Sequence, residues 1–291
     1  SDTVRVVTHG GAISALLSHV LGRIGRTTSM SIASNAAVTV VAISGAEPPQ
    51  LIVFNDATHL METAVHLGQR GNTVTLFRHG ETESNRLGRW HGRTDSPLSD
   101  RGKEQARAAM SQMPVVGQLF CSPLGRTRET AEILGEAQGL TPIVSEGFIE
   151  VAFGAWENLT PEEARLADPV AFAQIFERGV DLPFGGSGET FVDAAKRMAS
   201  AVESVVDIEA GDVAVVSHAA VIRAYVASFI GVSFGERNAL VVPRNTASSS
   251  VRFTDAKPTL TSYNVAPHLG NQYSALHGLA GGASRSLPDP R

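Results

Sequence analysis

The amino-acid sequence predicts an α/β fold, a three-layer α/β/α arrangement around a mostly parallel central sheet. From residue 72 onward, short β-branched apolar runs alternate with longer stretches of helical periodicity, the pattern of strand-helix-strand units. Three of these runs end in charged or polar side chains, as expected where parallel strands reach the binding edge of an open sheet. The chain has 291 residues, of which 43% are apolar, so it has room for one large domain and an additional segment.

Apolar runs, together with residues that cap or end helices, predict the first strands and helices of this domain. The apolar run 72–77 predicts a strand. The apolar side chains after Ser99 recur on one face and predict a helix, and Ser99 is expected to be its N-cap. Residues 115–121 predict the second strand. Ser122 is expected to cap the helix that follows, which Gly139 ends.

The later elements alternate in the same way. Residues 142–144 predict a short strand. Thr160 begins a capping box with proline at the first helical position, and a Gly/Pro loop precedes a helix over about 190–208. The last apolar run, 212–216, predicts a strand that ends at Ser217-His218.

The composition excludes several classes of protein. With 29 acidic and 24 basic residues the chain has no positive face for nucleic acid. Cys121 is the only cysteine, which excludes an intramolecular disulfide and a cysteine-ligated metal cage and favours a cytoplasmic location. No uncharged apolar run reaches the roughly 18 residues that cross a bilayer, so no membrane partner is expected.

A short repeat links the two ends of the chain. Val6–Gly11 matches Val215–Ala220 at an offset of 218 minus 9, or 209. Phe54–Leu60 matches Tyr263–Leu269 at the same offset. Residues 1–63 therefore resemble the second half of the domain that follows, and they predict a β-α-β-β unit.

This repeat sets the expected division of the chain. A unit so small buries little core, so it should pack on the complete domain, compete with residues 211–269 for the same place, or join a second chain in a homo-oligomer. It has no counterpart of Arg78-His79, so His9 and His59 should be structural or vestigial. The expected segments are a partial repeat at 1–63, a linker at 64–71, a complete domain at 72–269 and a flexible tail at 270–291.

Groups suited to phosphate follow three of the predicted strands. Arg78 and His79 come after the first strand, Arg126 just past the second and His218 after the last. Parallel strands bring such ends together. Two guanidiniums can then clamp the oxygens of a phosphoryl group with paired hydrogen bonds. The sequence thus predicts a phosphate pocket.

The same pocket has a candidate nucleophile and a candidate acid. A neutral imidazole at His79 can attack phosphorus, because flanking arginines disfavour a further positive charge, and a phosphohistidine results. Glu150, in an apolar stretch, is the candidate that protonates the leaving oxygen and later takes a proton from water. Asn85 and the backbone of Gly80 can supply further donors. We expect no metal and no cofactor.

These segments resemble the histidine phosphatase superfamily, the phosphoglycerate-mutase-like proteins. The likeness covers nearly all of residues 71–269, and five motifs carry it: Leu76–Asn85, Gly92–Leu98, Ser122–Thr127, Glu150–Glu157 and Ser217-His218. The resemblance implies that His79 is the phosphorylated nucleophile and Glu150 the proton donor and acceptor. It also implies a phosphate pocket formed by Arg78, Asn85, Arg126 and His218.

The resemblance bears on four further positions. The loop around Gly92 should contact substrate, although a plain turn explains it equally well. Glu157, the rival acid, falls where the family uses a residue outside the pocket. Asn158 stands where many relatives have glycine. Ala219-Ala220 replaces paired glycines, so Ala219 should line the pocket and add a methyl group to it.

Three functions remain open. The leading interpretation is a metal-independent phosphomonoesterase, a histidine acid phosphatase-like hydrolase that acts on a small phosphorylated metabolite. A phosphoglycerate-type mutase is the alternative, but such mutases carry an added basic and aromatic segment, and residues 158–188 contain only Arg165 and Arg178 as basic residues. The third is a phosphoryl-binding or scaffold module that turns nothing over.

Overall fold

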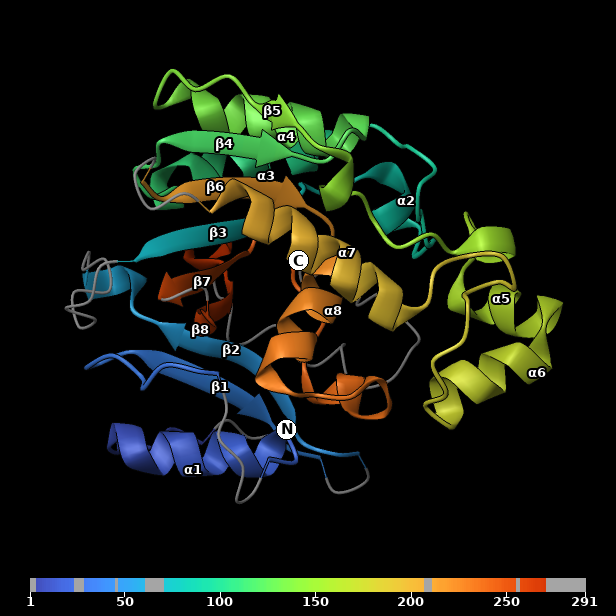
Figure 1. Cartoon of the computed structure of the whole chain (residues 1–291), viewed down its shortest axis with the longest axis horizontal. Helices are drawn as coiled ribbons and strands as arrows, with labels where there is room; N and C mark the ends of the chain where they lie inside the picture. Colours follow the sequence, from blue (N-terminus) through green and yellow to red (C-terminus); the bar gives the residue numbers. More distant parts are fainter. Residues whose placement is uncertain are drawn as a thin grey trace, which may run out of the picture.

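The computed structural model describes residues 4–23, 29–44, 47–60, 71–206, 211–254 and 257–270. Within these ranges one sheet of eight strands runs in the order β1-β2-β8-β7-β3-β6-β4-β5 (Figure 1). The strands are β1 (Val38–Ala42), β2 (Gln50–Asp56), β3 (Asn72–Arg78), β4 (Gln118–Cys121), β5 (Ile143–Val144), β6 (Val213–Ser217), β7 (Ser248–Thr254) and β8 (Lys257–Val265). Nearly all of the expected linker and tail lies outside the described residues.

The sheet is mixed, so the expectation of a mostly parallel sheet was wrong for the sheet as a whole. Strands β3, β6, β4 and β5 pair in parallel, whereas β7 is antiparallel to β3 and to β8, and β2 is antiparallel to β1 and to β8. The parallel strands are joined by long connections that contain helices, while the connections from β1 to β2 and from β7 to β8 are short. Short connections favour antiparallel neighbours.

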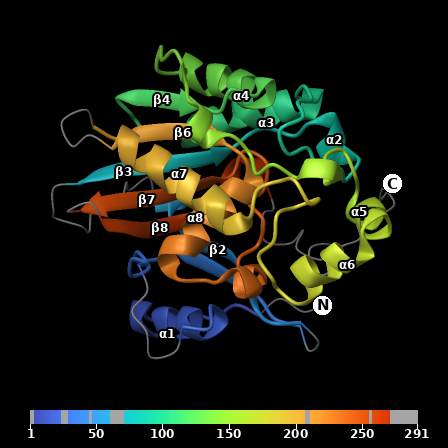
Figure 2. The same cartoon turned by 45° about the vertical axis from the view of Figure 1, so that its right-hand side comes forward.

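Helices cover both faces of the sheet, as predicted (Figure 2). Along β3 and β6 alternate side chains enter two different cores, because successive residues of a strand point to opposite faces. Leu76 and Val215 belong to the core that includes α7 (Phe191–Val205) and α8 (Ala219–Ile230). Phe77 and Val216 belong to the core that includes α3 (Asp100–Ala109) and α4 (Gly125–Glu136).

Local signals placed most helix starts correctly. Ser99 caps α3, Thr190 caps α7, and the capping box at Thr160 opens α5 (Pro161–Ala167). The exception is α4, which begins at Gly125 with no side-chain cap from Ser122. The remaining short helices are α2 (Glu83–Arg86) and α6 (Pro169–Phe172).

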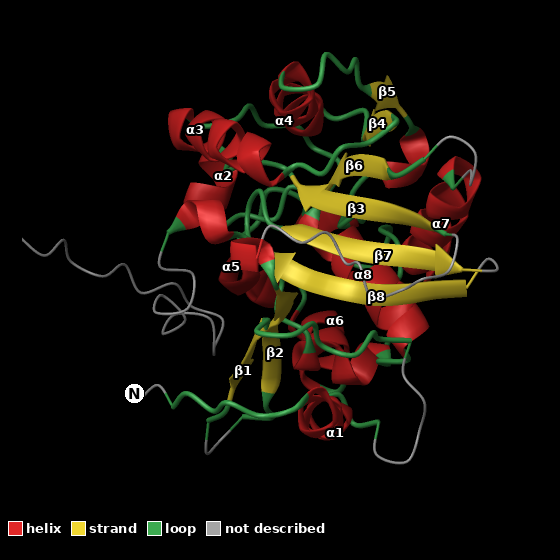
Figure 3. Cartoon of the chain, turned by 90° about the vertical axis from the view of Figure 1, so that its left-hand side faces the viewer, coloured by secondary structure: helices red, strands yellow, loops and turns green. Residues whose placement is uncertain are grey.

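The described residues 4–60, called here the N-terminal segment, pack on residues 71–270, called the main domain. The segment forms α1 (Gly10–Val20), β1 and β2, and β2 pairs with β8 through Phe54 and Tyr263 (Figure 3). It extends the sheet beyond β8 and does not take the place of residues 211–269. The predicted first strand of the unit was wrong, since residues 4–8 form none and Val7 is fully exposed. Among the described strands, none pairs with them.

In the described part of the chain, no helix combines the length and the apolar character that crossing a membrane requires.

Candidate active site

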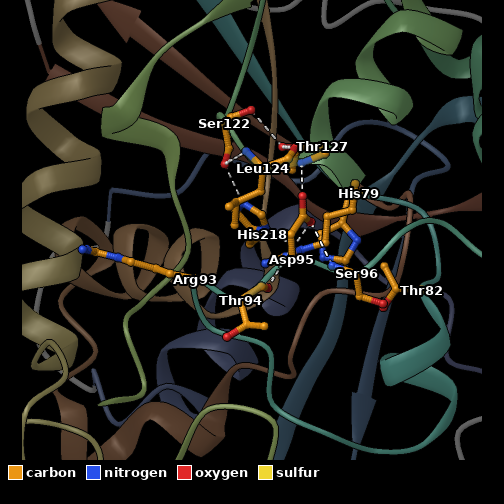
Figure 4. A network of polar contacts seen from close by, with 12 residues as sticks. His79, Thr82, Arg93, Thr94, Asp95, Ser96, Ser122, Leu124, Thr127 and His218 are labelled. Carbon is orange, nitrogen blue, oxygen red and sulfur yellow. Dashed lines mark hydrogen bonds and ion pairs between the residues drawn. The ribbon is translucent and has the colours of Figure 1, made fainter. Parts of the chain in front are cut away.

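Three parallel strands deliver the predicted phosphate-binding groups to one edge of the sheet. Arg78 at the end of β3 lies opposite Ser217 at the end of β6, so His79 and His218 follow side by side. Their ring centroids are 5.2 Å apart (Figure 4). Arg126, in the first turn of α4 after β4, donates from Nε to Nδ1 of His218 at 3.3 Å. The groups that the sequence placed on three separate strands therefore meet.

The hydrogen bonds of His79 fix its tautomer. Its Nδ1 lies 2.7 Å from the carbonyl oxygen of Gly80, and because a carbonyl only accepts, Nδ1 must carry the proton. Nε2 then keeps a lone pair. Burial, together with the charges of Arg126 and Arg78, holds the pKa of His79 well below its ordinary value. The ring is therefore neutral and nucleophilic at neutral pH.

His218 has the opposite tautomer for a similar reason. Because its Nδ1 accepts from Arg126, the proton is on Nε2, which donates to Oγ of Ser122 at 2.8 Å. Burial and the neighbouring Arg126 lower the pKa of His218 well below its ordinary value. Ser122 thus orients His218. Sequence reasoning assigned that hydroxyl to a helix cap, because its partner lies 96 positions away in the chain.

Arg126 is held by the loop that begins at Gly92. Nη2 donates to the carbonyl of Gly92 at 2.8 Å, and Nη1 donates to the carbonyl of Thr94 and to Asp95. Gly92 has a positive φ of 54°, and a Cβ there would lie 2.4 Å from a carboxylate oxygen of Glu157. Only glycine fits this position without displacement. The loop thereby fixes a guanidinium that is 1% exposed.

Glu157 supports that loop and does not line the cavity. Its carboxylate accepts from the backbone N–H groups of Arg93 and Thr94 and from the Thr94 hydroxyl. Partial burial opposes ionisation, but these hydrogen bonds outweigh it and lower the pKa of Glu157. A carboxylate that stays ionised in this way is a poor proton donor.

Glu150 has the properties of a general acid. It is 7% exposed, and its carboxylate accepts from the backbone N–H groups of Val151, Ala220 and Val221. Burial raises the pKa of Glu150, and these three hydrogen bonds only partly oppose it. Because two of the donors lie in the first turn of α8, the same carboxylate caps that helix beside His218.

Arg78 and Asn85 line the cavity as expected, whereas Gly80 does not. Nη1 of Arg78 donates to the carbonyl of Pro243, and burial lowers the pKa of Arg78 to about 10, which leaves it charged. Oδ1 of Asn85 accepts from Asn245, so its amide donors remain for a ligand. The N–H of Gly80 donates to the Thr130 hydroxyl at 3.1 Å. The expectation of a phosphate donor at Gly80 was wrong, because that N–H already has a partner.

Arg78, His79, Asn85, Arg126 and Glu150 line a cavity of about 220 Å³, whereas the fully buried His218 is not among its lining residues. The large aromatic and basic residues of the rest of the lining, called here the outer wall, are Trp90, Phe153, Phe176, Phe184, Phe191, Phe234, Arg89, Arg223 and Arg237. Arg237 lies 4.0 Å from the ring centroid of Phe234 and donates to carbonyl oxygens, while Arg223 donates to a carbonyl and to an amide oxygen. Neither has a carboxylate partner within the described residues.

Sequence reasoning missed His91, Arg223 and Arg237, which also line this cavity. His91 lines it with 6% exposure, and neither ring nitrogen has a hydrogen-bond partner among the residues that the structure describes. Arg223 gave one signal, because the repeat has Ser14 at the matching position, 223 minus 209. His91 and Arg237 gave none. Their place at the cavity depends on loops and helices that only the tertiary structure brings together.

No group of three or more metal-ligating side chains occurs among the residues that the structure describes. The positive charge of the cavity comes from guanidiniums instead.

Residues 74–266 match the family described as the histidine phosphatase superfamily (branch 1). The chain belongs to this superfamily. The match excludes the N-terminal segment, and nothing in it indicates a second partial copy of the domain. Because the match covers two thirds of the chain and the histidine pair meets beside two arginines, this is an enzyme of the phosphatase and mutase type.

Several histidine phosphatases are similar to most of the main domain. Phosphoserine phosphatase 1 of Hydrogenobacter thermophilus is 31% identical over 70% of this chain and 97% of its own length. A probable phosphoglycerate mutase GpmB of Yersinia pestis is 31% identical over 65% of this chain and 88% of its own length. The solved phosphoserine phosphatase of Entamoeba histolytica, in complex with 3-phosphoglyceric acid, has a TM-score of 0.60 at 28% identity and covers 68% of this chain and 99% of that one.

The structure shows the surroundings of both positions at which the sequence departs from the pattern of many relatives. Asn158 has a positive φ of 63°, a conformation that asparagine adopts more readily than most residues. Ala219 and Ala220 both line the cavity, where their methyl groups occupy space beside His218. Each methyl group thus takes up space that a glycine at the same position would leave to the cavity.

Proposed function

We propose that this protein is a metal-independent phosphomonoesterase that acts through a phosphohistidine at His79. One observation carries the proposal: the hydrogen bond from Nδ1 to the Gly80 carbonyl leaves an unprotonated Nε2 beside Arg126 at the base of the cavity. A neutral nucleophile among fixed guanidiniums suits attack on a phosphate dianion, because the arginines offset the charge that develops on its oxygens.

In the first step, the lone pair of His79 Nε2 forms a bond to phosphorus as the bond from phosphorus to the ester oxygen breaks. The leaving oxygen takes the proton of Glu150. Burial raises the pKa of Glu150, so its carboxyl group can hold that proton until this step. Arg78 and Arg126 hold the equatorial oxygens. The products are the phosphohistidine, the free alcohol and an ionised Glu150, so charge and protons balance.

In the second step, water attacks phosphorus and the bond to His79 breaks. Glu150, now ionised, takes a proton from that water and returns to its acid form. Inorganic phosphate leaves and Nε2 recovers its lone pair. The N–H groups of Val151, Ala220 and Val221 stabilise the carboxylate between the two steps.

We infer that the substrate is a small phosphate ester with a second anionic or strongly polar group. Arg223 and Arg237 lie on the outer wall without a carboxylate partner among the described residues, so they can accept such a group. The aromatic rings around them, Phe234 among them, accommodate its carbon skeleton. Phosphoserine and 3-phosphoglycerate, named for the similar proteins, have this composition and are the first candidates.

Rapid quenching during turnover tests this proposal. Wild-type protein should form an acid-labile, base-stable phosphoenzyme that decays to inorganic phosphate in the presence of a chelator, and His79→Ala should form none. If wild type releases phosphate no faster than His79→Ala while both bind the ester, the protein is a phosphoryl-binding module and the proposal fails.

A phosphoglycerate-type mutase is the second candidate, favoured by the surplus guanidiniums at Arg223 and Arg237. Such an enzyme keeps its phosphoenzyme from water and returns the phosphate to an organic acceptor. The trapped phosphoenzyme decides between them: transfer to glycerate or a phosphoglycerate faster than to water supports the mutase and overturns the hydrolase.

We further propose that residues 1–63 are related in sequence to residues 210–269 and contribute no catalytic group. The segment has no counterpart of Arg78 and His79, and its own His9 is exposed. Replacement of His9 should therefore leave turnover unchanged.

A further inference from the structure

The N-terminal segment and the last part of the main domain share an uncommon backbone geometry. Ala36 and Thr246 both have a φ of 57°, and Asn55 and Asn264 both have a φ of 55°. These are positive values that residues other than glycine adopt in a few per cent of cases. The offsets are 246 minus 36, or 210, and 264 minus 55, or 209. The second equals the offset of the sequence repeat, and the first differs from it by one residue, since Ser34–Ala36 matches Arg244–Thr246 after a one-residue slip.

The two asparagines make the same hydrogen bonds in exchanged positions. Nδ2 of Asn55 donates to the carbonyl of Thr261 at 2.7 Å, and Nδ2 of Asn264 donates to the carbonyl of Ile52 at 2.8 Å. Thr261 is the counterpart of Ile52, since 261 minus 52 is 209. Each asparagine thus reaches across to the strand that carries the other, as paired residues do across a two-fold axis.

Backbone contacts at the ends of the two strands are exchanged in the same way. The N–H of Ser31 donates to the carbonyl of Leu260 at 2.9 Å, and the N–H of Val241 donates to the carbonyl of Leu51 at 3.1 Å. Between these contacts lies the antiparallel pair of Phe54 and Tyr263, which are each other's counterparts. The contact between β2 and β8 therefore has the reciprocity of a symmetric dimer interface, although both strands belong to one chain.

We propose that β8 is a two-fold association edge for a second copy of the main domain, and that the N-terminal segment occupies this edge in the 291-residue chain. In the absence of the segment, β8 of one main domain would pair antiparallel with β8 of another about the position of Tyr263. Asn264 of each copy would then donate to the Thr261 carbonyl of the other.

The side chains permit this exchange of partner. Leu51 corresponds to Leu260 and Phe54 to Tyr263, and all four are at most 1% exposed. Replacing the segment by a second β8 therefore puts leucine in place of leucine and tyrosine in place of phenylalanine. Without any cover, β8 would expose a row of backbone groups and buried apolar side chains, an edge that promotes association.

Molar mass measured by light scattering tests the proposal. The main domain is a suitable object, because the match to the superfamily, residues 74–266, lies wholly within it. Residues 64–291 should form a dimer, and Leu260→Lys in that protein should make it monomeric. The control Val192→Lys, at an exposed position on α7, should leave the dimer intact. A monomer over a wide concentration range, or a dimer that Leu260→Lys leaves intact, overturns the proposal.

A variant of the full chain gives an independent test if the shortened protein does not fold. Phe54→Asp should release β2 from β8 while leaving β8 itself unchanged, and the chain should then dimerise. The exposed Ile43→Asp is its control and should keep the molar mass of the wild type.

Hydrogen exchange gives a second measurement on the same variant. Exchange of the Leu260 amide, which donates to the Ser29 carbonyl in the wild-type chain, should slow as the concentration of Phe54→Asp rises. Fast exchange at every concentration contradicts the proposal. None of these measurements depends on catalysis.

Discussion

The N-terminal segment and residues 218–264 of the main domain have the same plan, yet only one of them contributes to the active site. Each has a histidine, then a helix, then two antiparallel strands, and the second strand has an asparagine with positive φ one residue before its end. His218 is fully buried between Arg126 and Ser122, whereas His9 is exposed. The difference lies in the neighbours, because β3 and β4 run beside β6, whereas none of the described strands pairs with residues 4–8. A histidine at the start of a helix meets charged groups only where neighbouring strands bring them to it.

Substitution of the nucleophile gives the sharpest contrast between the two regions. His79→Ala should lower kcat/KM for a phosphate monoester by more than about 10⁴-fold, because no other side chain can form the covalent intermediate. His9→Ala, the matched control in the N-terminal segment, should retain the wild-type rate. A large loss in His9→Ala would mean that the segment takes part in catalysis.

Substitution of Glu150, the proposed general acid, should have the next largest effect. Glu150→Gln should lower kcat for an alkyl phosphate by about 10²-fold to 10⁴-fold, since the leaving oxygen then receives no proton from the protein. Because Glu150 must be protonated to act, the wild-type rate should fall as the pH rises through its raised pKa. The variant should lose this alkaline decline in the pH-rate profile.

Glu157→Gln is the control for this substitution, because Glu157 holds the loop over Arg126 and should not supply the proton. It should keep the alkaline decline even if its rate is lower. The opposite result, a decline that survives in Glu150→Gln and disappears in Glu157→Gln, would reassign the acid.

The paired asparagines test whether the two regions are equivalent in stability as well as in shape. Asn55→Gly and Asn264→Gly keep the positive φ but remove hydrogen bonds across β2 and β8, so each should lower the free energy of unfolding by about 2 to 3 kcal/mol. Asn158→Gly, at an exposed position with positive φ, should change it little. Urea denaturation measures all three, and strongly unequal losses at Asn55 and Asn264 would contradict a symmetric contact.

The pH dependence of stability should give the smallest effect. Burial lowers the pKa of His79 and His218 in the folded protein, so the unfolded chain binds more protons once the pH falls below the ordinary value of about 6.5. Stability from these two groups is fully present above that pH and is lost as the pH falls. His218→Gln should flatten the decline seen by urea denaturation between neutral and mildly acidic pH, and His9→Gln should not. Equal slopes in all three proteins would show that His218 is not buried as a neutral group.

Local chemistry was enough to predict much of the main domain. The capping box at Thr160 and the N-cap at Ser99 depend on residues within three positions of each other, so the sequence contains the whole interaction. The placement of His79, Arg126 and His218 at one edge followed from strand order and the rule that parallel strands share an end. The same reasoning failed at Ser122, whose hydroxyl bonds a histidine from a distant strand.

The sequence by itself determined most helices and strands between residues 72 and 217, because these depend on short-range patterns of polarity and on residue types. On the same grounds it predicts a nucleophile at His79 and a repeat. Only the tertiary structure decided that Gly80 donates to Thr130, that His91 and Arg237 reach the cavity, and that the N-terminal segment extends the sheet at β8. These outcomes depend on which surfaces remain unpaired after the main domain has folded. Such contacts join residues that are far apart along the chain, so the local sequence around either partner does not specify them.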